Sequence, residues 1–341
     1  MVRLRPLRLQ RSRGPYLLFV AILVLGGCTA DRPAGSTRIT STGESNPASP
    51  TDKNWLPDIA AVSGIHESPL EVDSVEASAT EAVPPIPPES KKSRTRSLDE
   101  LLLFLPTKVA PEAAPALPPG IESVWIKSAD GIRLNAWLAD HSAPVADVLF
   151  LHGNGGNVWG AAGFVRWLQS DAGCRVLALD YRGYGLSEGV PTVEGAIADG
   201  RAARAWLAER TQQAETRIVL AGHSLGGAIA VQLSREVEPR GLVLQSTFSS
   251  LKDVGRHHYG WLAGVIPRDR LNSVAALQNY RGSMFQSHGD ADPVIPLEFG
   301  ERLHAAAHGP KSFLRLAGAD HNRVLTPEYL TQLAAYLHQL P

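Results

Sequence analysis

A serine, a histidine and a pair of aspartates in this chain could together attack a carbonyl group. Ser224 lies in GHSLGG, Asp290 and Asp292 lie in HGDADPVIP, and His321 lies in AGADHN. A serine hydroxyl is a weak nucleophile at neutral pH, so it needs a base to take its proton and an acid to orient that base. His321 can be the base and one of the two aspartates the acid. These residue types predict acyl transfer through a covalent acyl-enzyme.

The surroundings of Ser224 favour a nucleophile over a serine in an ordinary turn. The apolar run at 218–221 predicts a buried strand, and apolar residues recur at helical spacing over 225–237. A strand that turns at once into a helix forces the serine between them into a strained conformation, the nucleophile elbow. A second Gly-x-Ser-x-Gly match, GLSEG, contains Ser187, but Pro191 separates that serine from any following helix.

From residue 120 onward, segments with strand patterns and helix patterns alternate along the chain. An antiparallel hairpin with its turn at Asp130 and Gly131 is expected first. The alternation that follows predicts an α/β fold, with a mostly parallel central sheet and helices on both faces. Ligands bind at the carboxyl ends of the strands in such sheets. The serine, the aspartates and the histidine each follow a predicted strand, so we expect them at one edge of the sheet.

These motifs make residues 120–341 resemble an α/β-hydrolase serine esterase. FLHGNGG, DYRGYGLSEG, GHSLGG, HGDADPVIP and DHN match that family's motif blocks in the same order, which is also its Ser, Asp, His order. The resemblance implies the α/β-hydrolase fold, with Asp292 before the Pro-Val step as the triad acid rather than Asp290. The chain is similar to a small-cap, membrane-associated branch that acts on monoacylglycerols, lysophospholipids or acylated proteins. Neither a metal nor an organic cofactor is implied.

Two backbone N–H groups are expected to stabilise the oxyanion that forms when the carbonyl is attacked. One belongs to Leu225, which follows the nucleophile at the start of the helix. The resemblance implies that the other belongs to Asn154 in HGNGGN, and that His152 shapes this loop. The alternative interpretation of HGNGGN is a simple turn from strand to helix.

A short cap insertion is expected at about 249–281. Its apolar residues either line an open acyl site or pack a lid helix on the core. His257 and His258 are expected to be exposed rather than metal ligands, since no third ligand stands at metal spacing. The apolar residues in question are Tyr259, Trp261, Leu262, Val265 and Ile266.

The first residues of the chain resemble the signal of a bacterial lipoprotein. Five arginines and no acid occur among the first thirteen residues, and about a dozen apolar residues follow, too few to span a membrane. LGGC resembles a lipobox, which implies that residues 1–27 are a signal peptide and that Cys28 is acylated. The alternatives are ordinary signal cleavage near Ala30 and an uncleaved anchor.

Residues 28–93 are rich in Pro, Ser, Thr, Ala and Glu without a regular period, so we expect a disordered tether ahead of a hydrolase domain at 94–341. The leucine-rich stretch at 97–106 is expected to pack on that domain, or to contact a membrane or substrate. Lipidated Cys28 would hold the protein on a membrane of the cell envelope, outside the cytoplasm. Thr29 after it resembles outer-membrane sorting, in a cell with two membranes.

Charge and cysteine content exclude other classes of function. The formal net charge is -1 and no long basic run occurs outside the N-terminus, so nothing suggests a nucleic-acid partner. Cys28 and Cys174 are the only cysteines, which argues against a disulfide framework, and no spacing resembles a zinc site. The sequence predicts a membrane-tethered serine hydrolase of small acyl esters. A thioesterase or peptidase with the same triad, or a catalytically idle binding lipoprotein, are the alternatives.

Overall fold

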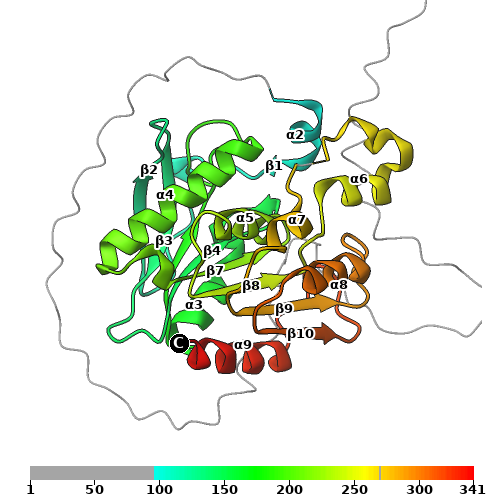
Figure 1. The fold of residues 1–341 in the computed structure, drawn as a ribbon. Helices are drawn as coiled ribbons and strands as arrows, with labels where there is room; N and C mark the ends of the chain where they lie inside the picture. Colours follow the sequence, from blue (N-terminus) through cyan, green and yellow to red (C-terminus); the bar gives the residue numbers. More distant parts are fainter. Residues whose placement is uncertain (1–95, 269) are drawn as a thin grey trace, which may run out of the picture. The chain divides into compact units, whose positions relative to one another are not determined.

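The computed structural model describes residues 96–341 apart from residue 269 and the side chains of Leu98 and Leu262. Eight strands of this part form one sheet, in the spatial order β10-β9-β8-β7-β4-β6-β3-β2 (Figure 1). These strands are β2 (Ile121–Lys127), β3 (Arg133–Ala139), β4 (Asp147–Leu151), β6 (Arg175–Leu179), β7 (Ile218–His223), β8 (Gly241–Gln245), β9 (Met284–Gly289) and β10 (Lys311–Leu316).

The sheet is parallel from β6 to β10, and β3 and β2 add an antiparallel hairpin at its edge. The hairpin turns at Gly131, which has a φ of 89° and donates its N–H to Ser128. The central strands are apolar and buried on both faces, as strands between two helix layers must be. Both the parallel sheet and the leading hairpin were expected from the sequence.

Helices cover both faces of the sheet, and a separate apolar core lies under each layer. One face carries α3 (Ala162–Ser170) and α9 (Pro327–Gln339), which stand below the sheet in Figure 1. The other face carries α4 (Val193–Thr211), α5 (Leu225–Ser234) and α8 (Leu297–Ala306). This arrangement is the α/β-hydrolase fold that the sequence predicted.

One helix is shorter than its apolar spacing suggested. The spacing after Ser224 extends to Val237, but α5 ends at Ser234. Pro239 lies two residues after Val237, and the residue before a proline is biased away from helical geometry. The helix therefore ends before it reaches Val237.

The segment between β8 and β9 contains α6 (Leu251–Tyr259), η5 (Gly260–Val265) and α7 (Ser273–Leu277). The apolar residues of this cap divide between two environments. Ile266 is buried in the core, whereas Trp261 and Val265 are 87% and 64% exposed. The side chain of Leu262, which the sequence placed in the same group, lies outside the described part.

The leucine-rich stretch ahead of the hairpin packs on the domain. It forms α2 (Leu98–Leu103) and then β1 (Leu105–Pro106), and Phe104 between them is buried in the core. β1 pairs in parallel with β5 (Gly155–Gly156), a two-residue strand in the loop after β4. Of the two interpretations of this stretch, the structure shows the packing.

The segments expected ahead of residue 94 lie outside the described part: the signal peptide at 1–27, the lipidated Cys28 and the tether that follows. Among the helices that the structure does describe, none combines the length and the apolar character needed to cross a bilayer.

Candidate active site

Ser224 has a backbone conformation that side-chain-bearing residues rarely adopt. It joins β7 to α5 with φ 52° and ψ -114°. Gly222 and Gly226 are required on either side of Ser224 because the backbone is closely packed around this turn. A Cβ atom at Gly222 would collide with the backbone of Gly226, and one at Gly226 would collide with the carbonyl of Leu151. This is the geometry expected of a nucleophile elbow.

The structure brings Ser224, His321 and Asp292 into one chain of contacts. His321 Nε2 lies 3.0 Å from Ser224 Oγ, and His321 Nδ1 lies 2.7 Å from Asp292 Oδ2. The three residues follow the carboxyl ends of β7, β9 and β10, and each is 8% exposed. The serine hydroxyl is thus within hydrogen-bond reach of a base, and the base is within reach of an acid.

The carboxyl group of Asp292 is built to remain charged. Its Oδ1 accepts the N–H groups of Val294 and Ile295, both at 2.8 Å, and His288 Nε2 lies 3.4 Å from Oδ2. Burial acts to raise the pKa of Asp292, but His288, His321 and the Ile295 N–H hold it well below its ordinary value. A carboxylate at this position keeps the Nδ1 proton on His321 and leaves Nε2 free to accept.

His223 contacts the proposed base, His321, through its backbone carbonyl and through its ring. Its Nε2 lies 3.0 Å from the backbone oxygen of His321, and the two rings are 5.1 Å apart. Burial, and then the nearby charge of His321, lower the pKa of His223 to about 3. The ring is therefore neutral at ordinary pH, and its Nε2–H donates to the carbonyl of His321. The packed ring of His223 therefore limits the directions in which the ring of His321 can move.

The loop after β4, which the sequence assigned to the oxyanion, lies beside the nucleophile. A Cβ atom at Gly153 would stand 2.9 Å from His223 Nδ1 and 3.6 Å from the Cβ of Ser224. Asn154 is held from two sides, because its Oδ1 accepts the Leu105 N–H at 2.9 Å and its carbonyl accepts the Tyr184 hydroxyl at 2.9 Å.

Leu225 is the first residue of α5, where a backbone N–H has no partner within the helix. The N–H of Leu225 and that of Asn154 in the neighbouring loop are the groups expected to bind the oxyanion. Leu225 directly follows Ser224, and Asn154 directly follows Gly153, which lies beside Ser224. The assignment of their N–H groups to the oxyanion stays a prediction.

His152 is part of the same loop and fixes its shape. Its Nδ1 donates to the carbonyl of Gly153 at 2.7 Å, and its Nε2 lies 3.3 Å from Asp180 Oδ1. The ring packs against Tyr181 and Tyr184, with ring centroids 4.8 Å and 5.2 Å away. These contacts join the loop after β4 to the loop after β6.

The two alternative site residues have other partners. Asp290 Oδ1 accepts the N–H of Gly318 at 2.7 Å, and its Oδ2 pairs with Arg315 at 3.1 Å. Ser187 is 2% exposed, and its hydroxyl donates to the carbonyl of Asp180 at 2.7 Å while it accepts the N–H of Asn135. Both groups are therefore engaged with partners other than His321.

Sequence reasoning missed three supports of this site. His223 and His288 lie within the GHSLGG and HGDADPVIP motifs, so their positions next to Ser224 and near Asp292 were a usable signal. The third support is the segment that follows β1. The N–H of Val109 donates to the carbonyl of Gly185, and the N–H of Gly185 donates to the carbonyl of Thr107. Nothing in the spacing of residues 105–109 pointed to that contact.

The cap histidines do not form a cluster with other ligands. His257 is exposed, and its ring packs on Phe299. His258 Nε2 lies 2.8 Å from the carbonyl of Val294 in the loop of Asp292. Across residues 96–268 and 270–341, no group of three His, Cys, Asp or Glu side chains is arranged to hold a metal ion.

Comparison with known proteins gives the family. The Hydrolase_4 family, described as serine aminopeptidase, S33, matches residues 142–275. The chain is 36% identical over 225 residues to the uncharacterized protein Rv2307c of Mycobacterium tuberculosis. The aligned region covers 65% of this chain and 79% of that protein. It is 28% identical over 216 residues to lysophosphatidylserine lipase ABHD12 of Bos taurus, covering 57% of this chain and 53% of the lipase.

Solved structures share the fold. The esterase Pf2001 of Pyrococcus furiosus is similar with a TM-score of 0.58 and 21% sequence identity, covering 70% of this chain and 97% of the esterase. This likeness concerns the fold, and it agrees with the order of the strands and with the helices on both faces of the sheet. Taken with the identity to the mycobacterial protein, these features show that the chain belongs to the α/β-hydrolase superfamily.

Proposed function

We propose that the protein is a serine hydrolase that cleaves carboxylic esters through an acyl-enzyme. The observation that carries this proposal is the contact chain from Ser224 Oγ to His321 Nε2 and from His321 Nδ1 to Asp292 Oδ2, at 3.0 Å and 2.7 Å. The strained backbone of Ser224 at the head of α5 supports the same role, because it presents the hydroxyl at the carboxyl edge of the sheet.

The geometry supports a two-step reaction. His321 Nε2 takes the hydroxyl proton as Ser224 Oγ attacks the ester carbonyl, and the resulting oxyanion accepts the N–H groups of Leu225 and Asn154. When the tetrahedral intermediate collapses, the ester C–O bond breaks and His321 gives its proton to the departing alcohol. Water then attacks the acyl-enzyme with His321 again as base, which releases the acid and restores the serine. Asp292 stabilises the charged imidazole in both steps.

The proposed substrates are small acyl esters such as acylglycerols or lysophospholipids. The sequence similarity to a lysophosphatidylserine lipase supports a lipid ester. Peptide hydrolysis is the second candidate, because the matching family is described as serine aminopeptidase, S33. Thioesters would be cleaved by the same groups. The cap favours no one of these classes by itself, since Trp261 and Val265 point into solvent.

We also propose that the protein acts at a membrane of the cell envelope. The arginine-rich first residues, the short apolar run and LGGC ending at Cys28 support a lipoprotein signal. Acyl chains on Cys28 would hold the protein at the lipid surface, where water-insoluble esters are concentrated.

The proposed function is tested by intact mass after treatment of the full chain with a fluorophosphonate. We expect one adduct on the parent and none on Ser224→Ala. Ser187→Ala is the matched control, since it removes the serine of the other Gly-x-Ser-x-Gly match, and it should still be labelled. An unlabelled but folded parent would favour the idle binding protein instead. Rates on ester, thioester and aminoacyl anilide substrates then rank the three reactions.

A further inference from the structure

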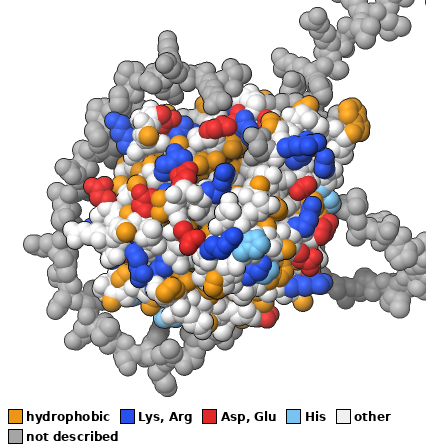
Figure 2. All heavy atoms as spheres, in the orientation of Figure 1, with side chains coloured by type: hydrophobic (Ala, Val, Ile, Leu, Met, Phe, Trp, Pro, Cys, Tyr) orange, Lys and Arg blue, Asp and Glu red, His pale blue; other side chains and the backbone are white. Residues whose placement is uncertain are grey.

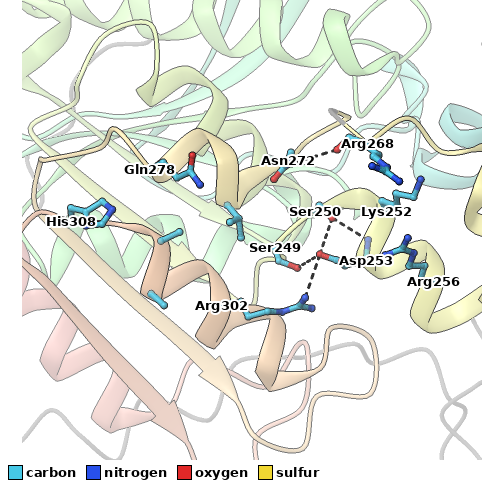
Figure 3. A pocket seen from close by; sticks show the side chains of 13 residues that line it. Ser249, Ser250, Lys252, Asp253, Arg256, Arg268, Asn272, Gln278, Arg302 and His308 are labelled. Carbon is cyan, nitrogen blue, oxygen red and sulfur yellow. Dashed lines mark hydrogen bonds and ion pairs between the residues drawn. The ribbon is translucent and has the colours of Figure 1, made fainter.

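An open cavity of about 770 Å³ lies between α6, α7 and α8, and its walls include none of Ser224, His321 or Asp292. Figure 3 shows its labelled side chains: Lys252, Arg256 and Arg268 lie on one side, and Arg302 lies across from them. The volume is in the range that small-molecule sites occupy in proteins. The cavity is therefore large enough for a phosphate group together with part of the organic molecule that carries it.

The charge of the lining is strongly positive. Four basic side chains face one acidic side chain, that of Asp253. That carboxylate already accepts the hydroxyl groups of Ser249 and Ser250 at 2.7 Å and 2.9 Å, and Arg302 lies 3.8 Å away. Its remaining capacity to neutralise the other three cations is small. The uncompensated charge corresponds to about one phosphate dianion or more.

Two of the arginines are available to a ligand. Arg256 and Arg268 are exposed, and neither forms an ion pair with a residue that the structure describes. Guanidinium groups bind phosphate oxygens through paired N–H donors. The side chain of Gln278 adds a neutral hydrogen-bonding group to the same walls, whereas the Asn272 amide already accepts the Ala275 N–H and donates to the Arg268 carbonyl. Lys and Arg side chains also lie over α6 and α8 on the face shown in Figure 2.

We propose that this cavity binds the phosphate group of a phosphate ester, through Arg256, Arg268 and Lys252. The phosphate belongs either to a soluble compound or to a lipid headgroup. The headgroup is included because Trp261 and Val265, the most exposed large apolar side chains of the described part, follow directly after α6. Tryptophan beside basic residues is typical of surfaces that touch a lipid interface. The site does not depend on the proposed hydrolase activity.

The first test is calorimetric titration of the full chain with inorganic phosphate, against chloride at equal ionic strength. Arg256→Gln with Arg268→Gln should weaken phosphate binding about tenfold or more, because a lost hydrogen bond to a charged group changes affinity by about that factor. Arg166→Gln with Arg235→Gln is the matched control, since it removes the same charge from exposed positions on or just after α3 and α5. The control pair should bind phosphate like the parent.

The second test separates the two sources of phosphate. The full-length proteins are sedimented with phosphatidylglycerol vesicles and with phosphatidylcholine vesicles. If the cavity pair loses both phosphate binding and its preference for the anionic vesicles, the ligand is a lipid headgroup. If it loses phosphate binding alone, the ligand is soluble. A parent that binds phosphate no better than chloride, or equal losses in both variant pairs, would overturn the proposal.

Discussion

The carboxylate of Asp292 is held through both of its oxygens. Both of its oxygens are engaged, Oδ1 by two backbone N–H groups and Oδ2 by His321, with His288 close to it. His288 is fully buried, and its Nε2 also lies 2.8 Å from the carbonyl of Ile295. A single histidine thus ties the side chain of the proposed acid to the backbone of its own loop.

We predict that His288→Leu lowers kcat about tenfold with little change in KM, because the variant loses the Nε2 hydrogen bond to the Ile295 carbonyl and the polar contact of Nε2 with Asp292 Oδ2, which together hold the loop of the acid. His288→Gln keeps an N–H near the position of Nε2 and should recover most of the activity. Steady-state kinetics on one ester substrate, with melting temperatures for both variants, checks this. Equal rates in the parent and in the leucine variant would remove His288 from any positioning role.

We expect activity to be lost at low pH through protonation of a single group, the proposed base. His223 has a pKa of about 3 because it is buried, and the pKa of Asp292 is held well below its ordinary value, so both keep their charge states across mildly acidic pH. Protonation of His321 alone then removes the base. We expect log(kcat/KM) to fall with a slope of about one as the pH is lowered, because a protonated imidazole cannot accept the serine proton. A flat profile, or a slope of two, would exclude His321 as the sole titrating base.

The candidate triad could be identified from the sequence because its residues lie in motifs that end predicted strands. The strand ends of a parallel sheet meet at one edge, so the order of the motifs was enough to predict that Ser224, Asp292 and His321 approach each other. The roles of His223 and His288 could not be deduced, because they depend on side-chain directions and on backbone carbonyls that only the folded loops provide.

At the scale of elements, the buried carboxylate of Glu100 links α2 to two other segments of the domain. Glu100 accepts the N–H of Ser97 at 2.9 Å, the N–H of Val193 at 3.1 Å and a guanidinium N–H of Arg270 at 3.0 Å. Burial acts to raise the pKa of Glu100, but these bonds lower it from 4.5 to about 2. The contact joins α2 to the start of α4 and to the segment before α7.

Glu100→Gln should therefore destabilise the protein by about 2 to 3 kcal/mol at neutral pH. Since the folded pKa lies below the ordinary one, this stabilisation is complete above about pH 4.5 and disappears as pH falls toward 2. Urea unfolding at pH 7 and pH 3 measures the difference. The exposed Glu112→Gln serves as the control. A gap between parent and Glu100→Gln that stays constant with pH would contradict the assignment.

The hydrolase fold was predictable at this scale, but the place of α2 and β1 was not. Alternating strand and helix patterns determine a parallel sheet, and the hairpin follows from its turn residues. β1 contains two residues, and its partner β5 is a pair of glycines, so neither carries the alternation by which strands are recognised. Their pairing depends on the fold around them rather than on local pattern.

At the scale of the whole molecule, the proposed membrane anchor depends on one of two cysteines. Cys174 is buried next to β6, and burial raises the pKa of its thiol to about 12, so it stays an unreactive thiol. Cys28, at the end of LGGC, is the residue proposed to carry lipid.

Cys28→Ala should shift the full chain, produced in a bacterial host with its signal, from the detergent phase to the aqueous phase on Triton X-114 partitioning. The intact mass should lose the acyl groups, since several chains on one cysteine supply the stable membrane binding. Cys174→Ala is the matched control and should partition like the parent. Unchanged partitioning of Cys28→Ala would count against the lipoprotein signal.

The fastening of α2 also determines how mechanical load enters the domain. A pull on the chain ahead of residue 96 meets α2 first, and Glu100 passes that load to Arg270 and to the start of α4. Leu105, whose N–H donates to Asn154 Oδ1, lies beyond these contacts along the chain. We therefore expect a force on the N-terminal side of the protein to load the contacts of Glu100 before it deforms the loop that contains Asn154.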